Sequence, residues 1–471
     1  MSLYSNISEV LNKQGMNVPI GTIYDQIPLW KSWFRGNVDN FHNYTITVAG
    51  SKKNKELKTM NMAKKVCEDF RKLLWTEKTK ITLSNVGASK KLWQILDNKE
   101  NSFSVNFPNF IEKAFALGTG ALIEYKNNEG RLIIDYIYAD VIIPFEYNNS
   151  YIKGLITISR DTKKERGTKI YNTVLTFHKF DGATYTKWSE LYKSKNESEL
   201  GRKLEFEAVY PDVENPYTVE TPFPHFQILK PNIVNNYDLD SPMGISIFAN
   251  SIDRLKAIDE KYDSFSREFR LGKRRIVVDS TFLKGRMEAD EEGNTKLVQY
   301  FDSDDETFIA VNGNENQPIK DIDFALRTDE HINAINAELN WLSSGIGLGS
   351  NYYKFDGVSI KTAKEVMSEN SEAFRTKEHH AILVNDVVYD LVYAICELEG
   401  ITTKTITIKS DDSIIEDKDT EQLRAMSEVS QGLRSKSNYL TEVRGLSESE
   451  ATTELDKIQT ERNVTDIFVE E

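Results

Sequence analysis

The sequence is poor in cysteine and histidine, with only two cysteines and six histidines among 471 residues. Cys67 and Cys396 each lie within a helical pattern and form no CxxC pair, so they offer no spacing typical of a zinc site. We expect two buried free thiols in a protein made in a reducing compartment. The adjacent histidines His379 and His380 do not face one site, because neighbouring residues on a helix point in different directions. The composition therefore predicts no metal site and no cofactor.

Long apolar runs are also missing. No stretch approaches the roughly 20 consecutive apolar residues of a membrane span. The N-terminus has no basic residues followed by an apolar run, so it does not read as a signal peptide. We expect a protein that is made in the cytoplasm and has no membrane partner.

Basic residues are fewer than acidic ones. The chain has 59 Lys and Arg residues and 73 Asp and Glu residues, which give a net charge of −14. A protein that clamps nucleic acid is usually basic. If this protein meets DNA, we expect it not to grip the duplex along its whole surface. Residues 403–471 hold nine Lys and Arg and sixteen Asp and Glu, so this tail carries half of the net charge.

Motifs that would indicate an enzyme are absent. The stretch "GIGLGS" at 345–350 lacks the GxxxxGK[ST] spacing of a phosphate loop and follows a predicted helix rather than a strand. GxSxG and HExxH do not occur, and "DSDDE" at 302–306 fits no calcium loop. A nucleotidyl transferase would need carboxylates clustered on strands, whereas 132–160 offers only Asp135, Asp140 and Glu146. We expect no catalytic residues.

Hydrophobic spacing predicts a mixed α+β chain that is mainly helical. Residues 62–74 show one apolar helical face. Residues 121–230 are rich in β-branched and aromatic residues, with turn signals such as Asp181-Gly182, and predict strands. Residues 359–399 contain neither glycine nor proline and predict a long helix.

A helix of roughly 40 Å is predicted from Gly244 to Gly272. Its apolar residues form a long, narrow stripe, which suits a helix that packs along its whole length. The stripe includes Ile245, Phe248, Ile252, Leu255, Tyr262, Phe265 and Phe269. We expect it to pack between subunits, since a monomer has little reason to bury it. A β-rich insert follows, and a second helix starts at Thr328.

A basic cluster ends the first of these helices, and it consists of Arg267, Arg270, Lys273, Arg274 and Arg275. Such residues complement a helix C-terminus and remain solvated. They also suit a nucleic-acid backbone or an acidic partner. The sequence leaves both interpretations open.

Five stretches in order resemble the tailed-bacteriophage portal proteins of the SPP1-like family. They are "KSWFRGN" at 31–37, "MAKKVCEDFRKLLWTEKTKI" at 62–81, "FIEKAFALGTGALIEY" at 110–125, "SPMGISIFANSIDRLKAIDEKYDSF" at 241–265 and "GLGSNYYKFDGVSIKTAKEVMSENSE" at 347–372. In the first stretch Phe34 stands where the family usually has Tyr. No single stretch is diagnostic, and the region 126–230 matches the family in character more than in letters.

The resemblance implies a portal fold whose subunits form a ring, usually of twelve. It divides the chain into a wing at 1–240, a first stem helix at 241–272, a clip at 273–327, a second stem helix at 328–344, a tunnel loop at 345–358, a wing-spanning helix at 359–402 and an acidic crown at 403–471.

The implied function is a channel at one capsid vertex through which double-stranded DNA is packaged and ejected. The implied partners are further copies of the chain, the DNA, the terminase large subunit, a head–tail adaptor, the scaffold and the major capsid protein. The protein would lie in the virion, and in the host cytoplasm during assembly. Another structural head or baseplate component is the alternative, but it would lack the stem–clip–stem–loop order.

The resemblance also gives the glycines after the second stem helix a role. Gly345, Gly347 and Gly349 would let the tunnel loop turn into the channel and return. Three large residues would then sit at its tip near the duplex, namely Tyr352, Tyr353 and Lys354. Packing of the two tyrosines on a neighbouring stem is the alternative.

Overall fold

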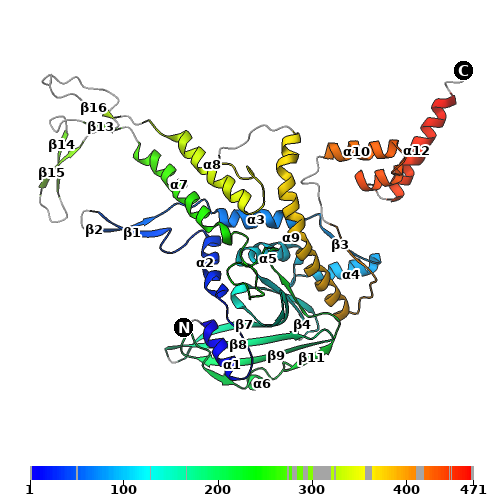
Figure 1. The fold of residues 1–471 in the computed structure, drawn as a ribbon, viewed down its shortest axis with the longest axis horizontal. Coiled ribbons are helices and arrows are strands. Elements are labelled where there is room, and N and C mark those ends of the chain that lie inside the picture. The colour runs from blue at the N-terminus through cyan, green and yellow to red at the C-terminus, as the bar shows by residue number, and fades with distance from the viewer. Residues whose placement is uncertain are drawn as a thin grey trace.

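The structure is a computed structural model that describes residues 3–48, 51–127, 129–165, 167–272, 275–277, 284–289, 295–300, 320–322, 325–355, 363–409, 418–444, 446 and 448–467. Its elements form a body of helices and sheets, from which a pair of helices leads away to a few small strands (Figure 1). Helix and strand are both well represented, so the α+β fold class is confirmed.

Five helices of the N-terminal region pack into one core: α1 (Leu3–Lys13), α2 (Ile23–Arg35), α3 (Met62–Leu74), α4 (Val86–Leu96) and α5 (Phe103–Leu117). The apolar face predicted for 62–74 is buried, and Val66, Cys67 and Phe70 are fully enclosed. Four phenylalanines of α5 are enclosed as well. Helix α5 ends at Gly118, whose φ of 84° is readily reached only by glycine.

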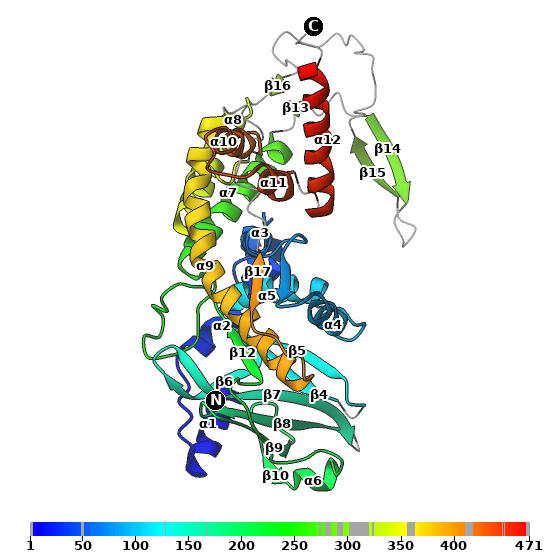
Figure 2. The ribbon, with the colours of Figure 1, turned by 90° about the vertical axis from the view of Figure 1, so that its right-hand side faces the viewer.

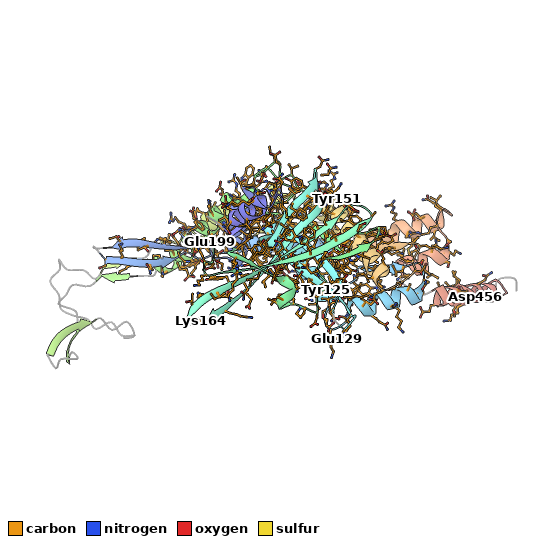
Figure 3. All side chains as sticks on the ribbon, turned by 90° about the horizontal axis from the view of Figure 1, so that it is seen from below. Tyr125, Glu129, Tyr151, Lys164, Glu199 and Asp456 are labelled. Carbon is orange, nitrogen blue, oxygen red and sulfur yellow. The ribbon has the colours of Figure 1, made fainter. Side chains whose placement is uncertain are left out.

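The region 121–230 forms antiparallel sheets, as its composition predicts. One sheet contains β6 (Ile142–Asn148), β7 (Tyr151–Glu165), β8 (Thr168–Phe180), β9 (Thr184–Ser194), β10 (Arg202–Leu204) and β11 (Tyr217–Glu220). The other contains β4 (Gly120–Lys126), β5 (Leu132–Tyr138) and β12 (Phe226–Leu229). Seen from below, the larger sheet crosses the middle of the molecule, and Tyr151 and Lys164 mark the two ends of β7 (Figure 3).

A two-stranded hairpin, β1 (Asn43–Val48) and β2 (Ser51–Glu56), projects from the body beside the helix pair (Figure 1). This hairpin was not predicted, since the sequence indicated strands only from residue 121 onward. The alternation in "NYTITV" is a strand signal, but the polar "SKKNKE" of β2 is not.

The helix pair consists of α7 (Ile252–Leu271) and α8 (Thr328–Gly345), which pack side by side (Figure 1). Between them the chain forms β13 (Arg275–Val277) paired with β16 (Lys320–Ile322), and β14 (Lys284–Ala289) paired with β15 (Thr295–Tyr300). The small β-rich insert between two helices is therefore present. The rest of the insert lies outside the described residues.

The prediction that the first of these helices starts at Gly244 is wrong, because α7 starts at Ile252. The preceding segment docks on the end of α5 instead. The N–H of Gly244 donates to Thr119 Oγ1 (3.0 Å), and the N–H of Ile247 donates to the Phe115 carbonyl (2.9 Å). These bonds across the chain replace helical ones, so the helix cannot extend backward through this segment.

Helix α9 (Ala363–Leu398) runs along the body and reaches the smaller sheet (Figure 2). Strand β17 (Ile406–Lys409) then pairs with β3 (Lys80–Leu83), which ties the C-terminal part of the chain to the N-terminal helices. Helices α10 (Lys418–Ser430), α11 (Lys436–Asn438) and α12 (Glu448–Ile467) stand apart from the body (Figure 1). In the described part of the chain no helix is both long and apolar enough to cross a membrane.

Candidate functional site

Helices α7 and α8 are joined by charged and aromatic contacts along their length. Glu338 of α8 accepts from Lys261 Nζ (2.9 Å) and from Arg254 (3.4 Å) on α7. Nearer the small strands, Glu268 of α7 accepts from Arg327, which precedes α8 (2.8 Å). The hydrogen bonds from Arg327 lower the pKa of Glu268 to about 2. The two helices therefore form one unit within a single subunit.

Several residues of the stripe predicted to lie between subunits instead pack within one subunit. Ile245 and Phe248 are fully buried in the body and lie outside the helix, and Leu255 is buried as well. Phe265 packs on His331 of α8, with ring centroids 5.7 Å apart. Phe265 itself is half-buried. The chain thus covers part of the stripe by itself, and packing of its residues between subunits stays a prediction.

Three further stripe residues are less enclosed. Ile252 and Tyr262 are half-buried, and Tyr262 packs edge-on against Phe355 (6.2 Å between centroids). Phe269 remains 45% exposed near the end of α7. Whether a neighbouring copy contacts Phe269 stays a prediction.

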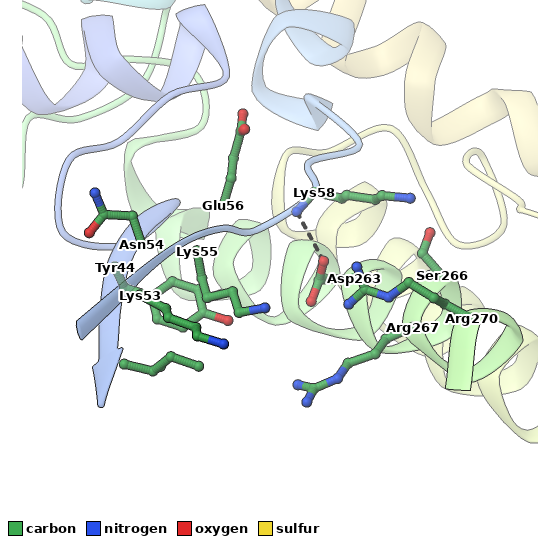
Figure 4. A pocket seen from close by; sticks show the side chains of 11 residues that line it. Tyr44, Lys53, Asn54, Lys55, Glu56, Lys58, Asp263, Ser266, Arg267 and Arg270 are labelled. Atoms are coloured by element: carbon green, nitrogen blue, oxygen red, sulfur yellow. Dashed lines mark hydrogen bonds between the residues drawn. The ribbon is translucent and has the colours of Figure 1, made fainter. Parts of the chain in front are cut away.

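The face of α7 opposite to α8 lines a groove of about 800 Å³ together with the hairpin β1–β2 (Figure 4). Five cationic side chains gather there, namely Lys53, Lys55, Lys58, Arg267 and Arg270. Two carboxyl groups, Glu56 and Asp263, lie among them. Within the part of the chain that the structure describes, none of the five cations forms an ion pair.

The structure places only part of the predicted basic cluster in this groove. Arg267 and Arg270 are exposed. Arg275 opens β13, where only the backbone is described. Lys273 and Arg274 lie outside the described residues. The lysines of the hairpin were not predicted, because their strand is too polar to be recognised in the sequence.

Asp259 of α7 fixes the base of the hairpin. This residue is buried, and its carboxyl group accepts from His42 Nε2 (3.0 Å), Thr59 Oγ1 (2.8 Å) and the Met60 N–H (2.8 Å). His42 precedes β1, and Thr59 and Met60 follow β2. Both ends of the hairpin are therefore bonded to one side chain of α7.

The segment after α8, residues 346–355, lies back along the helix, and we call it the strap. Backbone N–H groups of three alternate strap residues donate to polar side chains of α8: Asn351 to Asn340 Oδ1 (3.1 Å), Tyr353 to Ser343 Oγ (3.2 Å) and Phe355 to Asn336 Oδ1 (2.8 Å). The acceptors are spaced four and three residues apart, so they share one helix face. The strap is thus bonded to its own helix.

The prediction that Tyr353 sits at a loop tip is wrong. Its side chain is only 7% exposed, and its hydroxyl donates to Asp69 Oδ2 of α3 (3.0 Å). Burial and the neighbouring Asp69 raise the pKa of Tyr353 well above its usual range. Tyr353 therefore joins the strap to the body of its own subunit and faces neither solvent nor a neighbour.

The other predicted loop residues differ in their surroundings. Tyr352 is half-buried, and burial raises its pKa to about 12. Lys354 is exposed. Residues 356–358, which complete the predicted tunnel loop, lie outside the described residues.

Two of the three predicted turn glycines have the expected conformation. Gly347 and Gly349 have φ values of +79° and +85°, which other residues rarely adopt. A Cβ on Gly347 would also come within 2.7 Å of Thr376 Oγ1. Gly345 is different, because it is the last residue of α8 and has helical backbone.

Some buried titratable groups in the described part of the chain have raised pKa values. No group of three or more His, Cys, Asp or Glu residues there could hold a metal ion. The two cysteines are buried, as predicted, and burial raises the pKa of Cys396 to about 11. Burial also raises the pKa of Glu124 well above its usual range, against a 2.7 Å hydrogen bond from Gln227. The sequence analysis did not identify this carboxyl group, which sits in a strand.

The chain matches the model of a family described as phage portal protein, SPP1 Gp6-like, over residues 21–466. No curated protein matches it. Among solved structures it is similar to a chain in the neck of an empty gene transfer agent particle computed with C6 symmetry, with 10% identity over 93% of this chain and 98% of that one and a TM-score of 0.50.

Two further structures are similar at a TM-score of 0.42. One is the neck of a native gene transfer agent particle computed with C12 symmetry, with 11% identity over 93% of this chain and 98% of that one. The other is the virion of a native particle, with 10% identity over 82% of this chain and 88% of that one. At these identities the likeness concerns the fold alone.

Proposed function

This chain belongs to the phage portal protein family of the SPP1 Gp6-like type, and from that premise we propose that about twelve copies close into a ring at one vertex of the capsid. Double-stranded DNA passes through the centre of the ring during packaging and ejection. The number twelve comes from the family resemblance. The C6 symmetry used for the similar particle neck is compatible with rings of six or twelve subunits.

One observation carries the proposal beyond family membership. Two paired helices, α7 and α8, lead away from the body to a small β-rich piece inserted between them (Figure 1). Repeated around an axis, such pairs make a helical tube with the inserts at one end. This supports the assignment of 273–327 as the clip and of the two helices as the stem.

The clip is proposed as the platform for the terminase large subunit during packaging and for the head–tail adaptor afterwards. The body forms the wing and the acidic residues 403–471 the crown, which face the scaffold and the major capsid protein inside the capsid. ATP hydrolysis belongs to the terminase, so the chain itself catalyses no reaction.

Within the strap, Lys354 is the residue proposed to face the DNA. It is exposed, whereas Tyr353 beside it is buried in the subunit. A single lysine per subunit gives weak contacts with phosphates, which suits DNA that must slide. Lys354→Ala should leave ring formation unchanged and alter the rate of DNA packaging into proheads.

Negative-stain microscopy of the purified protein tests the proposal. We expect a ring with a central hole, and a particle of about twelve times the mass of one chain by light scattering. A monodisperse monomer across micromolar concentrations would contradict the proposed function.

A second experiment tests the clip. Replacing residues 285–320 by a short linker should leave rings intact, since the deleted residues lie beyond the stem helices. Binding of the terminase to these rings should be lost. Terminase binding that survives the deletion would show that the platform lies elsewhere on the ring.

A further inference from the structure

The two faces of α7 are occupied differently. Successive helical residues are rotated by about 100°, so the α8-contacting residues Arg254, Lys261, Phe265 and Glu268 fall within about 60° of one another. The groove-lining residues Asp263, Ser266, Arg267 and Arg270 centre on the opposite side, about 180° away. One lateral face of the stem is thus covered within the subunit, and the other opens into the groove.

The groove concentrates positive charge on a protein with a net charge of −14. Its five cations outnumber its two carboxyl groups. One of those two, Asp263, already accepts from the backbone N–H of Lys58 (3.2 Å). The groove therefore keeps an excess of positive charge, whose mutual repulsion an acidic partner would relieve.

The hairpin that lines one side of the groove is hydrogen-bonded at its base, but its strand β2 is not covered by other residues. Its base is bonded to Asp259 of α7 by groups on both sides of the hairpin. Every residue of β2 is exposed, however. A two-stranded hairpin gains little stability by itself in water. A fixed base and an uncovered hairpin are the features of a surface that meets a partner.

One face of α8 carries a row of exposed residues that includes a carboxyl group, and we call it the α8 stripe. It comprises Glu330, Asn333, Ala337 and Trp341, spaced three, four and four residues apart on one helix face. All four are exposed. Trp341 is 64% exposed even though Arg254 lies 5.4 Å from its ring centroid. An exposed tryptophan is a frequent anchor of protein interfaces.

We propose that the α8 stripe of one subunit docks into the groove between α7 and the hairpin of the next subunit. This inference rests on the proposed ring. Neighbours in a closed ring meet through two different faces, and the groove and the α8 stripe are the two open faces of the stem. The occupant of the groove is therefore a second copy of this chain.

The positions of the charged residues along the length of the helix pair support this pairing. The Glu268–Arg327 hydrogen bond places the end of α7 level with the start of α8. A rotation about the ring axis keeps each residue at its own height, so Glu330 of one copy comes level with Arg267 and Arg270 of the next. Ala337, which has a small side chain, lets the backbones approach further along the stem.

Cross-linking between different chains tests the contact. Ser266→Cys is placed in the groove and Asn333→Cys in the α8 stripe, while the native Cys67 and Cys396 are buried and do not compete. We expect a covalent dimer after mild oxidation of rings assembled from a mixture of the two variants. Rings of either variant alone should give none. A chain that carries both cysteines should give a ladder of covalent oligomers.

Charge reversal gives an independent measurement. Arg267→Glu combined with Arg270→Glu should raise the protein concentration needed for half-assembly by about tenfold or more. Adding Glu330→Arg to the same chain should restore part of the loss, because every contact then has opposite charges again. Far-ultraviolet circular dichroism checks that the variants are folded.

The outcomes separate the inference from the proposed function. If the wild-type chain forms no ring, the proposed function fails. If rings form but the mixed cysteine variants give no covalent dimer, the docking inference alone is wrong. It is also wrong if the double glutamate variant assembles normally but its rings retain less of a short DNA duplex, because the groove is then a nucleic-acid surface.

Discussion

Replacing Asp259 by alanine removes the carboxyl group of α7 that accepts three hydrogen bonds from the two ends of the hairpin. Three donors lose their partner: His42 Nε2, the Thr59 hydroxyl and the Met60 N–H. The hydroxyl can rotate toward another acceptor. The imidazole cannot switch to the other tautomer, because its Nδ1 already accepts from the Val38 N–H (2.8 Å).

The buried His42 Nε2–H and the partly buried Met60 N–H are therefore left unsatisfied in Asp259→Ala. Each costs about 1–3 kcal/mol, so the free energy of unfolding should fall by about 2–6 kcal/mol. The loss should be largest locally, where the backbone N–H of Leu57 bonds to the His42 carbonyl at the base of the hairpin (2.8 Å).

The assay combines denaturant unfolding with amide hydrogen exchange at a fixed protomer concentration, because assembly shifts the apparent stability. Protection of the amides of residues 57–60 should be reduced in the variant. Asp253→Ala is the matched control, since Asp253 lies on the same helix but its side chain is 94% exposed and, among the described residues, pairs with Lys256 at 3.2 Å. The control should change stability by less than about 0.5 kcal/mol.

Free energies of unfolding for Asp259→Ala and Asp253→Ala that lie within about 0.5 kcal/mol of each other would contradict this prediction. It is also refuted if exchange at residues 57–60 is unchanged. In either case the hairpin base would be held by contacts other than this carboxyl group, and the fixed-base part of the docking inference would fall with it.

Tyr353→Phe removes the hydroxyl that donates to Asp69 and should lower the free energy of unfolding by about 1–2 kcal/mol, measured by denaturant titration; no change would show that the strap is held without this bond. Gly347→Ala should cost about 1 kcal/mol or more because of its positive φ, whereas Gly345→Ala at the helical end of α8 should be nearly neutral, and equal thermal shifts would contradict this difference. Glu124→Gln should become more stabilising relative to wild type as pH rises from about 4 to 8. Burial raises the pKa of Glu124 in the folded chain, so the wild-type subunit loses stability with rising pH, whereas the neutral amide does not. A difference in unfolding free energy that does not depend on pH would contradict the raised pKa.

Several elements of the fold could be predicted from the sequence because they depend on local spacing. The apolar face of 62–74, the strands of 121–230 and the long helix near 359–399 all have patterns that neighbouring residues complete among themselves. The two helices flanking a β-rich insert were predictable for the same reason. The positive φ of Gly347 and Gly349 is also local, since a turn after a good helix needs such residues.

The start of α7 was not predictable, because it depends on bonds across the chain. Ile245 and Phe248 continue the helical spacing of the residues after them, and nothing local interrupts it. The end of α5 takes the hydrogen bonds of Gly244 and Ile247 instead. A backbone group satisfied by a distant partner is invisible in a pattern of nearby side chains.

The sequence by itself determined that α7 has an apolar stripe, but only the tertiary structure decided what covers it. Periodicity shows that a face avoids water and does not show whether the same chain or another copy provides the cover. Here α8 covers the stripe of α7, and Tyr353 is buried against α3 and Asp69, a residue far away in the sequence. The stem has two open faces, the cationic groove and the α8 stripe. They could be identified only in the tertiary structure, because each is a surface that distant segments of the chain leave exposed.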